Sequence, residues 1–525
     1  NVTIAPNRLL VLGTAPAGMV ERAFHTQMVA VRTHDGRSAF ANSTDVSVPA
    51  SLQGVVQSVL GLQTVHMLHT FARPMASGSA STFAVTGHNP TEFASIYGGS
   101  GVPTAAGVTV GIVTNGNLDN TISDLNIFTS NNGLPTVTTE IINTDGTSHD
   151  TTGTSEWDLD SQDIVGMGGG EVGKIIFYNM PSLYNTDLVD DFNTAVTRNE
   201  AKIINVSLGE CETSAQGDGS AAASDNIFKQ AVAQGQTFSI STGDSGADEC
   251  GDGGTTPSWP ANSQYVVAAG GTTLNASSTT WSGETVWSGT GGSASLYEPM
   301  PSWQVGVGQN AGHNTRGLPD IAYDADPNSG AQIIVKGRLQ QWGGTSLSAP
   351  LFAGFWARMI AAKGTSIGFA APQLYQLAAS DFHDVTSGNN GGESAAPGWD
   401  YTTGFGSIIM NQALSSLGGG GGGGTGNSPP TASFNDSVSG LTVTFTNTST
   451  DSDGSVVSSS WNFGDGGTST ATSPSHTYAA YGTYTVTLTV TDDGGASSTT
   501  SQSVKLSQHG KGNGGGGGGH GHTTH

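Results

Sequence analysis

The sequence predicts an α/β protein with a parallel sheet covered by helices on both faces. Three observations support this fold class. Between residues 107 and 417, short apolar runs alternate with helix-like stretches, as in parallel sheets whose strands are joined by helices. After the glycine run Gly418–Gly424, apolar and polar residues alternate, which predicts a separate antiparallel module. A shorter segment before residue 73 mixes strand-like and helix-like patterns.

Composition excludes some partners. The chain has 525 residues, with 16 Lys and Arg against 41 Asp and Glu, a formal net charge of −25. We expect no nucleic-acid partner, because phosphate binding requires clustered Lys and Arg. Only 11% of the residues are charged and few are basic, which suits a protein that works in acid. No apolar run approaches the roughly 18 residues of a membrane span. No signal-peptide pattern is present, so we expect any export signal to lie outside this sequence.

Residues 1–72 are predicted to form a small α+β unit. The runs Arg8–Gly13 and Met28–Arg32 are typical of strands, and Leu52–Leu62 has apolar residues at helical spacing. The stretch Met75–Ser81 that follows is small and polar, like segments that proteases cut. Residues 73–87 are therefore predicted to be a processing linker.

Residues 88–417 are predicted to form the main domain. Its expected helices include Asp187–Arg198 and Asp225–Gln234. Its expected strands are the apolar runs Val108–Val113, Lys174–Phe177, Ala201–Val206, Thr237–Ile240 and Tyr265–Ala269. In such folds the active site gathers at the carboxyl ends of the strands.

The last part of the chain is predicted to contain a linker, a domain and a tail. Residues 418–428 are rich in glycine, which favours a flexible linker. Residues 429–507 alternate apolar and polar side chains, which predicts a small antiparallel β-sandwich. Residues 508–525 are mostly glycine and histidine, cannot build a core, and are predicted to be disordered.

The strongest chemical motif is GGTSLSAP at Gly343–Pro350. Glycines before a serine allow a sharp turn that exposes its hydroxyl. The residues after Ser346 can start a helix whose free N–H groups help to hold an oxyanion. Ser346 is therefore a candidate nucleophile. The alternative interpretation is a plain turn before a buried helix.

A serine nucleophile needs a base, and the sequence offers two solutions. His149 is the best candidate among the histidines, although no aspartate ends the strand that runs into Thr114. The other solution is Glu156 with Asp160, because helical spacing places both carboxylates on one face, close enough to share a proton. The alternative interpretation of this pair is a solvated acidic helix start.

Asp244 is a further candidate. It directly follows the expected strand Thr237–Ile240, in the glycine turn Ser241–Gly246, and would lie at the mouth of the sheet. Its alternative role is to cap that turn.

Together these motifs resemble the sedolisin family of serine-carboxyl peptidases, in particular its bacterial xanthomonalisin-like members, over roughly residues 1–417. The resemblance implies a subtilisin-like fold in which Ser346 is the nucleophile and Glu156 is the base and then the acid. It also implies that Asp160 orients Glu156 and that Asp244 stabilises the oxyanion. Supporting segments that look like parts of the family are Asn205–Gly209, Ser258–Gly271 and Arg316–Pro327.

Two positions depart from the family pattern. Some members place a glutamate where this chain has Thr114, and the usual serine two residues before the oxyanion aspartate is Thr242 here. The second change is expected to be harmless, because Asp244 remains.

The proposed chemistry and an acidic environment agree with each other. A histidine with a pKa near 6.5 is protonated at about pH 4 and cannot act as a base. A paired, partly buried glutamate can still cycle a proton there. A protonated aspartic acid can also donate a hydrogen bond to an oxyanion, which an ionised one cannot.

A calcium site is implied by the same resemblance. The segments Phe382–Val385 and Ala395–Asp400 look like the sedolisin calcium site. Carboxylate oxygens would come from Asp384 and Asp400, and all-oxygen ligation suits one structural Ca²⁺ ion. Backbone carbonyls would come from Val385, Ala396 and Gly398. The alternative interpretation is an ordinary loop of glycine and aspartate.

The flanking regions also resemble known modules. Residues 1–72 resemble the later part of a sedolisin propeptide, which would fold against the peptidase, keep it inactive and be cut off in acid. Residues Trp461–Gly466, His476–Tyr478 and Gly482–Val490 resemble a polycystic-kidney-disease (PKD) type domain, which serves as a spacer or binds a polymeric substrate. Cys211 and Cys250 are either one disulfide or two thiols, and secretion would favour the disulfide.

We therefore predict a secreted, extracellular, acid-acting endopeptidase made as a self-processing zymogen. It is expected to be a monomer that acts on proteins and peptides and is inhibited by its own propeptide. One alternative is a subtilisin-like peptidase that uses His149. The other is a non-catalytic adhesion or binding protein with a relict peptidase fold. The pH dependence of hydrolysis distinguishes the three.

Overall fold

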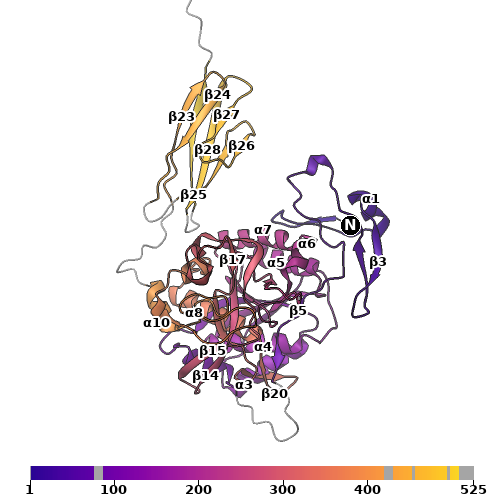
Figure 1. The fold of residues 1–525 in the computed structure, drawn as a ribbon, viewed down its shortest axis with the longest axis vertical. Coiled ribbons are helices and arrows are strands. Elements are labelled where there is room, and N and C mark those ends of the chain that lie inside the picture. Colours follow the sequence, from indigo (N-terminus) through magenta and orange to yellow (C-terminus); the bar gives the residue numbers. More distant parts are fainter. Residues whose placement is uncertain (1, 76–86, 419–429, 452–455, 493–496, 508–525) are drawn as a thin grey trace, which may run out of the picture. The chain divides into compact units, whose positions relative to one another are not determined.

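The computed structural model describes residues 2–75, 87–418, 430–451, 456–492 and 497–507 (Figure 1). The chain forms two compact units, Asn1–Gly419 and Gly420–His525. Most of the predicted processing linker, nearly all of the predicted glycine linker and the whole predicted tail lie outside the described residues.

The first unit is built on a sheet of eight strands in its described part. The strand order is β15-β14-β12-β10-β7-β9-β8, and β18 also pairs with β14. All neighbours are parallel except β14 and β15, so the predicted parallel sheet is confirmed. The strands are β7 (Ala105–Asn115), β8 (Thr139–Asn143), β9 (Val172–Met180), β10 (Ile203–Val206), β12 (Thr237–Ser241), β14 (Val267–Ala276), β15 (Trp281–Val286) and β18 (Ile321–Asp324).

Helices cover both faces of this sheet, as predicted (Figure 1). Successive residues of β12 point to opposite faces. Phe238 packs against Phe192 of α5 (Asn185–Arg198) and Phe228 of α7 (Ser220–Ala233), with ring centroids 5.6 and 4.9 Å away. The next residue, Ser239, donates a hydrogen bond of 2.8 Å to the carbonyl of Ala349 in α8 (Thr345–Lys363). The apolar helix α8 also packs against α4 (Thr154–Met167).

Smaller elements complete the first unit. The remaining helices after residue 87 are α2 (Pro90–Ile96), α3 (Asp119–Asn131), α6 (Glu212–Asp218), α9 (Ala370–Leu374) and α10 (Met410–Gly418). The remaining strands there are β11 (Leu208–Cys211), β13 (Ser258–Trp259), β16 (Ala294–Pro299), β17 (Thr315–Gly317), β19 (Ala331–Val335), β20 (Arg338–Gly343), β21 (Phe382–His383) and β22 (Ser407–Ile408). Cys211 and Cys250 form a disulfide, which confirms the favoured interpretation of the two cysteines.

The N-terminal segment is α+β, as predicted, with one error. It contains β1 (Val2–Ile4) paired with β2 (Val11–Gly13), α1 (Ala17–Phe24), and β3 (Met28–Arg32) paired with β4 (Ser38–Asn42). The predicted helix Leu52–Leu62 is wrong, because only a short 3₁₀ turn forms at Ala50–Leu52. Gly54 and Gly61 adopt φ values of +78° and +80°, which a helix does not accommodate. Leu62 is buried, but Leu52 and Val55 are exposed, so the apolar spacing does not mark one packed face.

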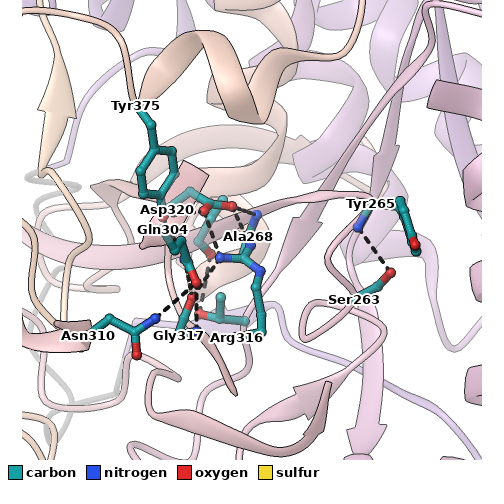
Figure 2. Close-up of polar contacts among 11 residues, drawn as sticks. Ser263, Tyr265, Ala268, Gln304, Asn310, Arg316, Gly317, Asp320 and Tyr375 are labelled. Carbon is teal, nitrogen blue, oxygen red and sulfur yellow. Dashed lines mark hydrogen bonds and ion pairs between the residues drawn. The ribbon is translucent and has the colours of Figure 1, made fainter. Parts of the chain in front are cut away.

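A buried ion pair fixes the chain just before β18 (Figure 2). Arg316 and Asp320 are fully buried and joined by two hydrogen bonds of 2.6 and 2.9 Å. Asp320 also accepts from Tyr375 Oη at 2.7 Å and from the backbone N–H of Ala268 in β14 at 2.8 Å. Because both carboxylate oxygens are satisfied, this loop is tied to the central sheet.

The second unit is the predicted antiparallel sandwich. One sheet has the order β23-β24-β27 and the other β26-β25-β28-β29. Trp461, Phe445 and Val486 are among the side chains buried between them. The strands are β23 (Phe434–Ser439), β24 (Thr442–Asn447), β25 (Val456–Asn462), β26 (Thr468–Ser469), β27 (Ser475–Thr477), β28 (Gly482–Asp492) and β29 (Ser497–Leu506). Among the residues with described positions, no helix of either unit has the length and apolar character needed to cross a membrane.

Candidate active site

Helix α4 carries the two carboxylates predicted to act together. Glu156 and Asp160 lie one turn apart and are 1% and 0% exposed, so the interpretation as a solvated helix start is wrong. Asp160 Oδ1 accepts a hydrogen bond of 2.6 Å from Ser207 Oγ, just beyond the carboxyl end of β10. Asn205 Nδ2 in turn donates to Ser207 Oγ at 3.1 Å. Asp160 is thus held by a short polar chain that starts in the central sheet.

Burial dominates the electrostatics of this pair. It raises the pKa of Glu156 well above its ordinary value, and the charge of Asp160 raises it further. Burial likewise raises the pKa of Asp160, while hydrogen bonds from Ser207 and Asn205 act in the opposite direction. Two carboxylates this close in an apolar site do not both ionise readily. The pair therefore retains a proton at a pH where an exposed glutamate is ionised.

Ser346 lies in the first turn of α8 and is fully buried. The preceding Gly344 has φ +99° and ψ 166°, and a Cβ there would lie 2.0 Å from the carbonyl oxygen of Phe71. Only glycine fits such a turn, as the motif predicted. Neither Ser346 Oγ nor Glu156 Oε1 has a hydrogen-bond partner in the described part of the chain, but the serine hydroxyl is close enough to lower the pKa of the glutamate. The structure thus brings the predicted nucleophile next to the predicted carboxyl base.

Asp244 follows β12 and faces the start of α8. Its Oδ1 accepts from the backbone N–H of Thr345 at 2.8 Å and from Thr345 Oγ1 at 2.9 Å. Its Oδ2 accepts from Arg73 Nε at 3.1 Å. Burial raises the pKa of Asp244 to about 7, although Thr345 and Arg73 both lower it. In acid this carboxyl is protonated and able to donate a hydrogen bond.

His149 is not part of this cluster. It is exposed on the loop between β8 and α4. In the described part of the chain no contact links His149 to Ser346, whereas the Ser346 hydroxyl lowers the pKa of Glu156. Thr114 is also structural, because its hydroxyl donates to Asn179 Oδ1 at 3.1 Å inside the sheet.

An extended stretch of the N-terminal segment runs through the site. Strand β5 (His69–Thr70) pairs antiparallel with β11, and β6 (Arg73–Pro74) pairs antiparallel with β20. Between them, the backbone N–H of Ala72 donates to Glu156 Oε2 at 2.7 Å. The ring of Phe71 is fully buried against Gly209, where a Cβ would lie 2.7 Å from its Cζ atom. The segment therefore occupies the position of an extended peptide.

Two hydrogen bonds tie the carboxylates of the predicted metal site to the backbone of the 395–400 segment. Asp384 Oδ2 accepts from the backbone N–H of Gly398 at 2.9 Å, and Asp400 Oδ2 accepts from that of Ala396 at 2.8 Å. Two carboxylates and three nearby carbonyls make an all-oxygen donor set that fits a hard cation. Within the described ranges no group of three or more His, Cys, Asp or Glu side chains could hold a metal ion. Any site here therefore depends on the backbone carbonyls of Val385, Ala396 and Gly398.

Comparison with protein families defines the class. Residues 106–406 match the subtilase family, residues 1–65 match the pro-kumamolisin activation domain, and residues 427–506 match the PKD domain. These matches confirm the subtilisin-like fold, the propeptide region and the PKD-type domain. The first unit is thus a subtilase with an attached pro-domain.

Individual relatives narrow the class. The chain is 46% identical to sedolisin of Pseudomonas sp. (strain 101) over 441 residues, which cover 78% of this chain and 75% of that protein. It is 46% identical to xanthomonalisin of Xanthomonas sp. (strain T-22) over 512 residues, covering 84% of this chain and 61% of that protein. The solved structure of Pseudomonas sedolisin, a serine-carboxyl proteinase complexed with two molecules of pseudo-iodotyrostatin, aligns with a TM-score of 0.62 at 47% identity. That alignment covers 64% of this chain and all of the other. The chain belongs to the sedolisin family of serine-carboxyl peptidases.

Sequence reasoning missed several residues of the site. Asn205 and Ser207 lie in a segment that resembles the family, but the hydrogen bond from Asn205 to Ser207 and that from Ser207 to Asp160 have no sequence signature. Arg73 was assigned to the linker, and Glu249, described below, was not considered. Both make contacts between distant parts of the chain. Arg73 and Asp244 are 171 residues apart in sequence, and His69 and Glu249 are 180 residues apart.

Proposed function

We propose that this chain is the secreted zymogen of an acid-acting endopeptidase, with Ser346, Glu156, Asp160 and Asp244 as its catalytic machinery. Burial of three carboxyls around one serine supports acid action, because each has a raised pKa. A histidine base would be protonated under those conditions. The disulfide supports secretion, because disulfides persist mainly in oxidising compartments.

The proposed reaction uses each group once or twice. Ser346 Oγ attacks the carbonyl carbon of the substrate while Glu156 takes the hydroxyl proton. Protonated Asp244 donates a hydrogen bond to the oxyanion that forms. Glu156 then gives the proton to the leaving nitrogen, and the carbon–nitrogen bond breaks. In the second half Glu156 takes a proton from water as the water attacks the ester, then returns that proton to Ser346 Oγ as the ester carbon–oxygen bond breaks and the new carboxylic acid is released. Asp160 keeps Glu156 oriented throughout.

One observation carries this proposal: the position of the Phe71–Ala72 peptide bond. Its nitrogen donates to Glu156 Oε2 at 2.7 Å, the atom that would later protonate a leaving amine. Its carbonyl oxygen lies beside Gly344, at the turn that presents Ser346. We therefore expect the first self-cleavage at Phe71–Ala72. This is just N-terminal to residues 73–87, which the sequence suggested as the processing linker.

The loop around Asp384 and Asp400 is the proposed site of one structural Ca²⁺ ion. Support comes from the convergence of the predicted ligands and from their all-oxygen chemistry. The ion would supply charge compensation and rigidity to this loop rather than take part in bond cleavage. Binding of a polymeric substrate by the PKD domain stays a prediction.

Self-processing of the full chain tests the catalytic assignment. Glu156→Gln and Asp160→Asn are nearly isosteric, so we expect folded proteins that fail to release the segment before Ala72 between pH 3 and pH 7. His149→Ala is the matched control and should process like the wild type. N-terminal sequencing of the wild-type product should identify Ala72. Normal processing of Glu156→Gln together with loss of processing in His149→Ala would overturn the assignment.

A further inference from the structure

The bound N-terminal strand places a basic side chain against a buried carboxylate. His69 Nε2 lies 3.0 Å from Glu249 Oε1. The side chain of Glu249 is only 1% exposed, while that of His69 is 49% exposed. Its other oxygen, Oε2, has no hydrogen-bond partner in the part of the chain that the structure describes. Burying a carboxylate oxygen without a hydrogen-bond partner costs free energy, so a cationic side chain of a bound chain would stabilise Glu249.

The disulfide fixes this carboxylate relative to the peptide-binding strand. Glu249 is followed by Cys250, whose partner Cys211 ends β11, and β11 pairs directly with His69 and Thr70. The backbone N–H of Glu249 also donates to the carbonyl of Thr256 at 2.9 Å. The disulfide and this hydrogen bond therefore hold Glu249 at a fixed position relative to any strand that pairs with β11.

A second acidic group faces the same position. Glu210 lies on β11, burial raises its pKa to about 7, and the charge of His69 lowers it. His69 and Phe71 lie on the same side of the strand, with ring centroids 4.8 Å apart, because side chains two apart share a face. The pocket that holds Phe71 and the acidic position that holds His69 are therefore adjacent.

We propose that Glu249 is a specificity-determining residue that selects a basic side chain two residues before Phe71 of the N-terminal strand. The proposal rests on the proposed function for the position of the cut bond. Consider a substrate that pairs with β11 in the same register and is cut after the residue that takes the place of Phe71. Its side chain two residues earlier, in the place of His69, then faces Glu249. The chemistry that this position recognises is a cationic side chain, from lysine, arginine or protonated histidine.

Peptides test this directly. Processed enzyme is assayed at pH 5 on fluorogenic peptides of the sequence Leu68–Pro74, with Lys, His, Gln or Glu at position 69. For the wild type we expect kcat/KM to be about tenfold or more higher with Lys than with Gln, from a charged hydrogen bond. In Glu249→Gln this ratio should fall toward one, mainly through KM, because the contact is the same before and during bond cleavage.

Two controls make the result specific. Asp252→Asn removes a negative charge from the same loop, is exposed and should keep the Lys preference. Moving Lys to position 68 or 70 of the peptide should give no gain. An unchanged Lys preference in Glu249→Gln, or a preference that lies at another peptide position, would overturn the role of Glu249. If no peptide is cut at the Phe–Ala bond while other bonds are cut, the assigned bond is wrong. Absence of all hydrolysis would overturn the proposed function itself.

Discussion

Replacing Asp244 by Ala or by Asn separates a catalytic carboxyl from a turn cap. In the zymogen, Thr345 donates twice to Oδ1, and Arg73 donates to Oδ2. Oδ2, the oxygen that faces Arg73, is the one that would carry the catalytic proton. Burial raises the pKa of Asp244 to about 7, although Thr345 and Arg73 both lower it. Asp244 is therefore a neutral donor throughout the acid range.

The two substitutions differ in what they retain. Asp244→Ala removes the donor, and loss of one oxyanion donor typically costs about 10²–10³ in turnover, roughly 3–4 kcal/mol of barrier. Asp244→Asn keeps an acceptor for Thr345 and places an amide donor where Oδ2 was. We expect the Asn variant to be more active than the Ala variant at pH 4. Its high-pH limb should shift or flatten, because an amide donates at any pH. KM should change much less than kcat, since the interaction strengthens only as charge develops.

The assay is steady-state hydrolysis of one peptide from about pH 3 to pH 7. Each variant is first processed in trans by tagged wild-type enzyme, which is then removed. Equal activity of wild type, Ala and Asn would reduce Asp244 to a turn cap. Folded but equally inactive Ala and Asn variants would show that the carboxyl does more than donate one hydrogen bond.

Three further predictions concern stability and are measured in a Ser346→Ala background, which prevents processing. Asp384→Asn should lower the Tm measured in calcium and abolish the effect of a chelator on the Tm, because ion binding adds to the folding free energy. An equal wild-type Tm with and without chelator would count against a calcium site. Arg316→Met should lower the free energy of unfolding by about 3–5 kcal/mol in urea titrations, because Asp320 loses its buried partner; a loss under 1 kcal/mol would contradict this. Burial raises the pKa of Asp158 to about 9 in the folded chain, from an ordinary value of 3.8. The folded chain therefore holds a proton on Asp158 that the unfolded chain loses above pH 4, so the free energy of unfolding falls as pH rises toward 9. Asp158→Asn should therefore reduce the fall in stability between pH 5 and pH 8 by about 1.4 kcal/mol per pH unit, and an unchanged slope would refute it.

The main sheet was predictable because its strands are buried on both faces. Runs such as Lys174–Phe177 and Thr237–Ile240 stand out in the sequence, since a parallel sheet covered by helices needs apolar residues at successive positions. Each lies within an observed strand. The error at Leu52–Leu62 has the opposite cause. Several of its apolar residues stay exposed, so no buried face stabilises a helix, and Gly54 and Gly61 interrupt the backbone.

The grouping of the candidate residues was predictable from the sequence, but their surroundings were not. Four-residue spacing correctly placed Glu156 and Asp160 on one helical face. Their burial was not predictable, because a helix with four carboxylates in 14 residues has the composition of a solvated one. Its surroundings are set by α8 and by strands far away in sequence. The strand that occupies the site was missed for the same reason, since its pairing with β11 and β20 is a tertiary contact.

Strands β11 and β20 both pair with the segment His69–Pro74. This pairing limits which chains can bind in the same way. Each pairs with main-chain groups of the bound segment, one on either side of the Phe71–Ala72 bond. A chain must therefore be extended to enter, at about 3.3 Å per residue, and a helix at 1.5 Å per residue cannot satisfy both partners. The site thus selects first for an extended backbone of the bound chain and only then for its side chains. On the proposed mode of cleavage, a tightly folded protein offers no such extended segment, whereas a protein unfolded by acid does.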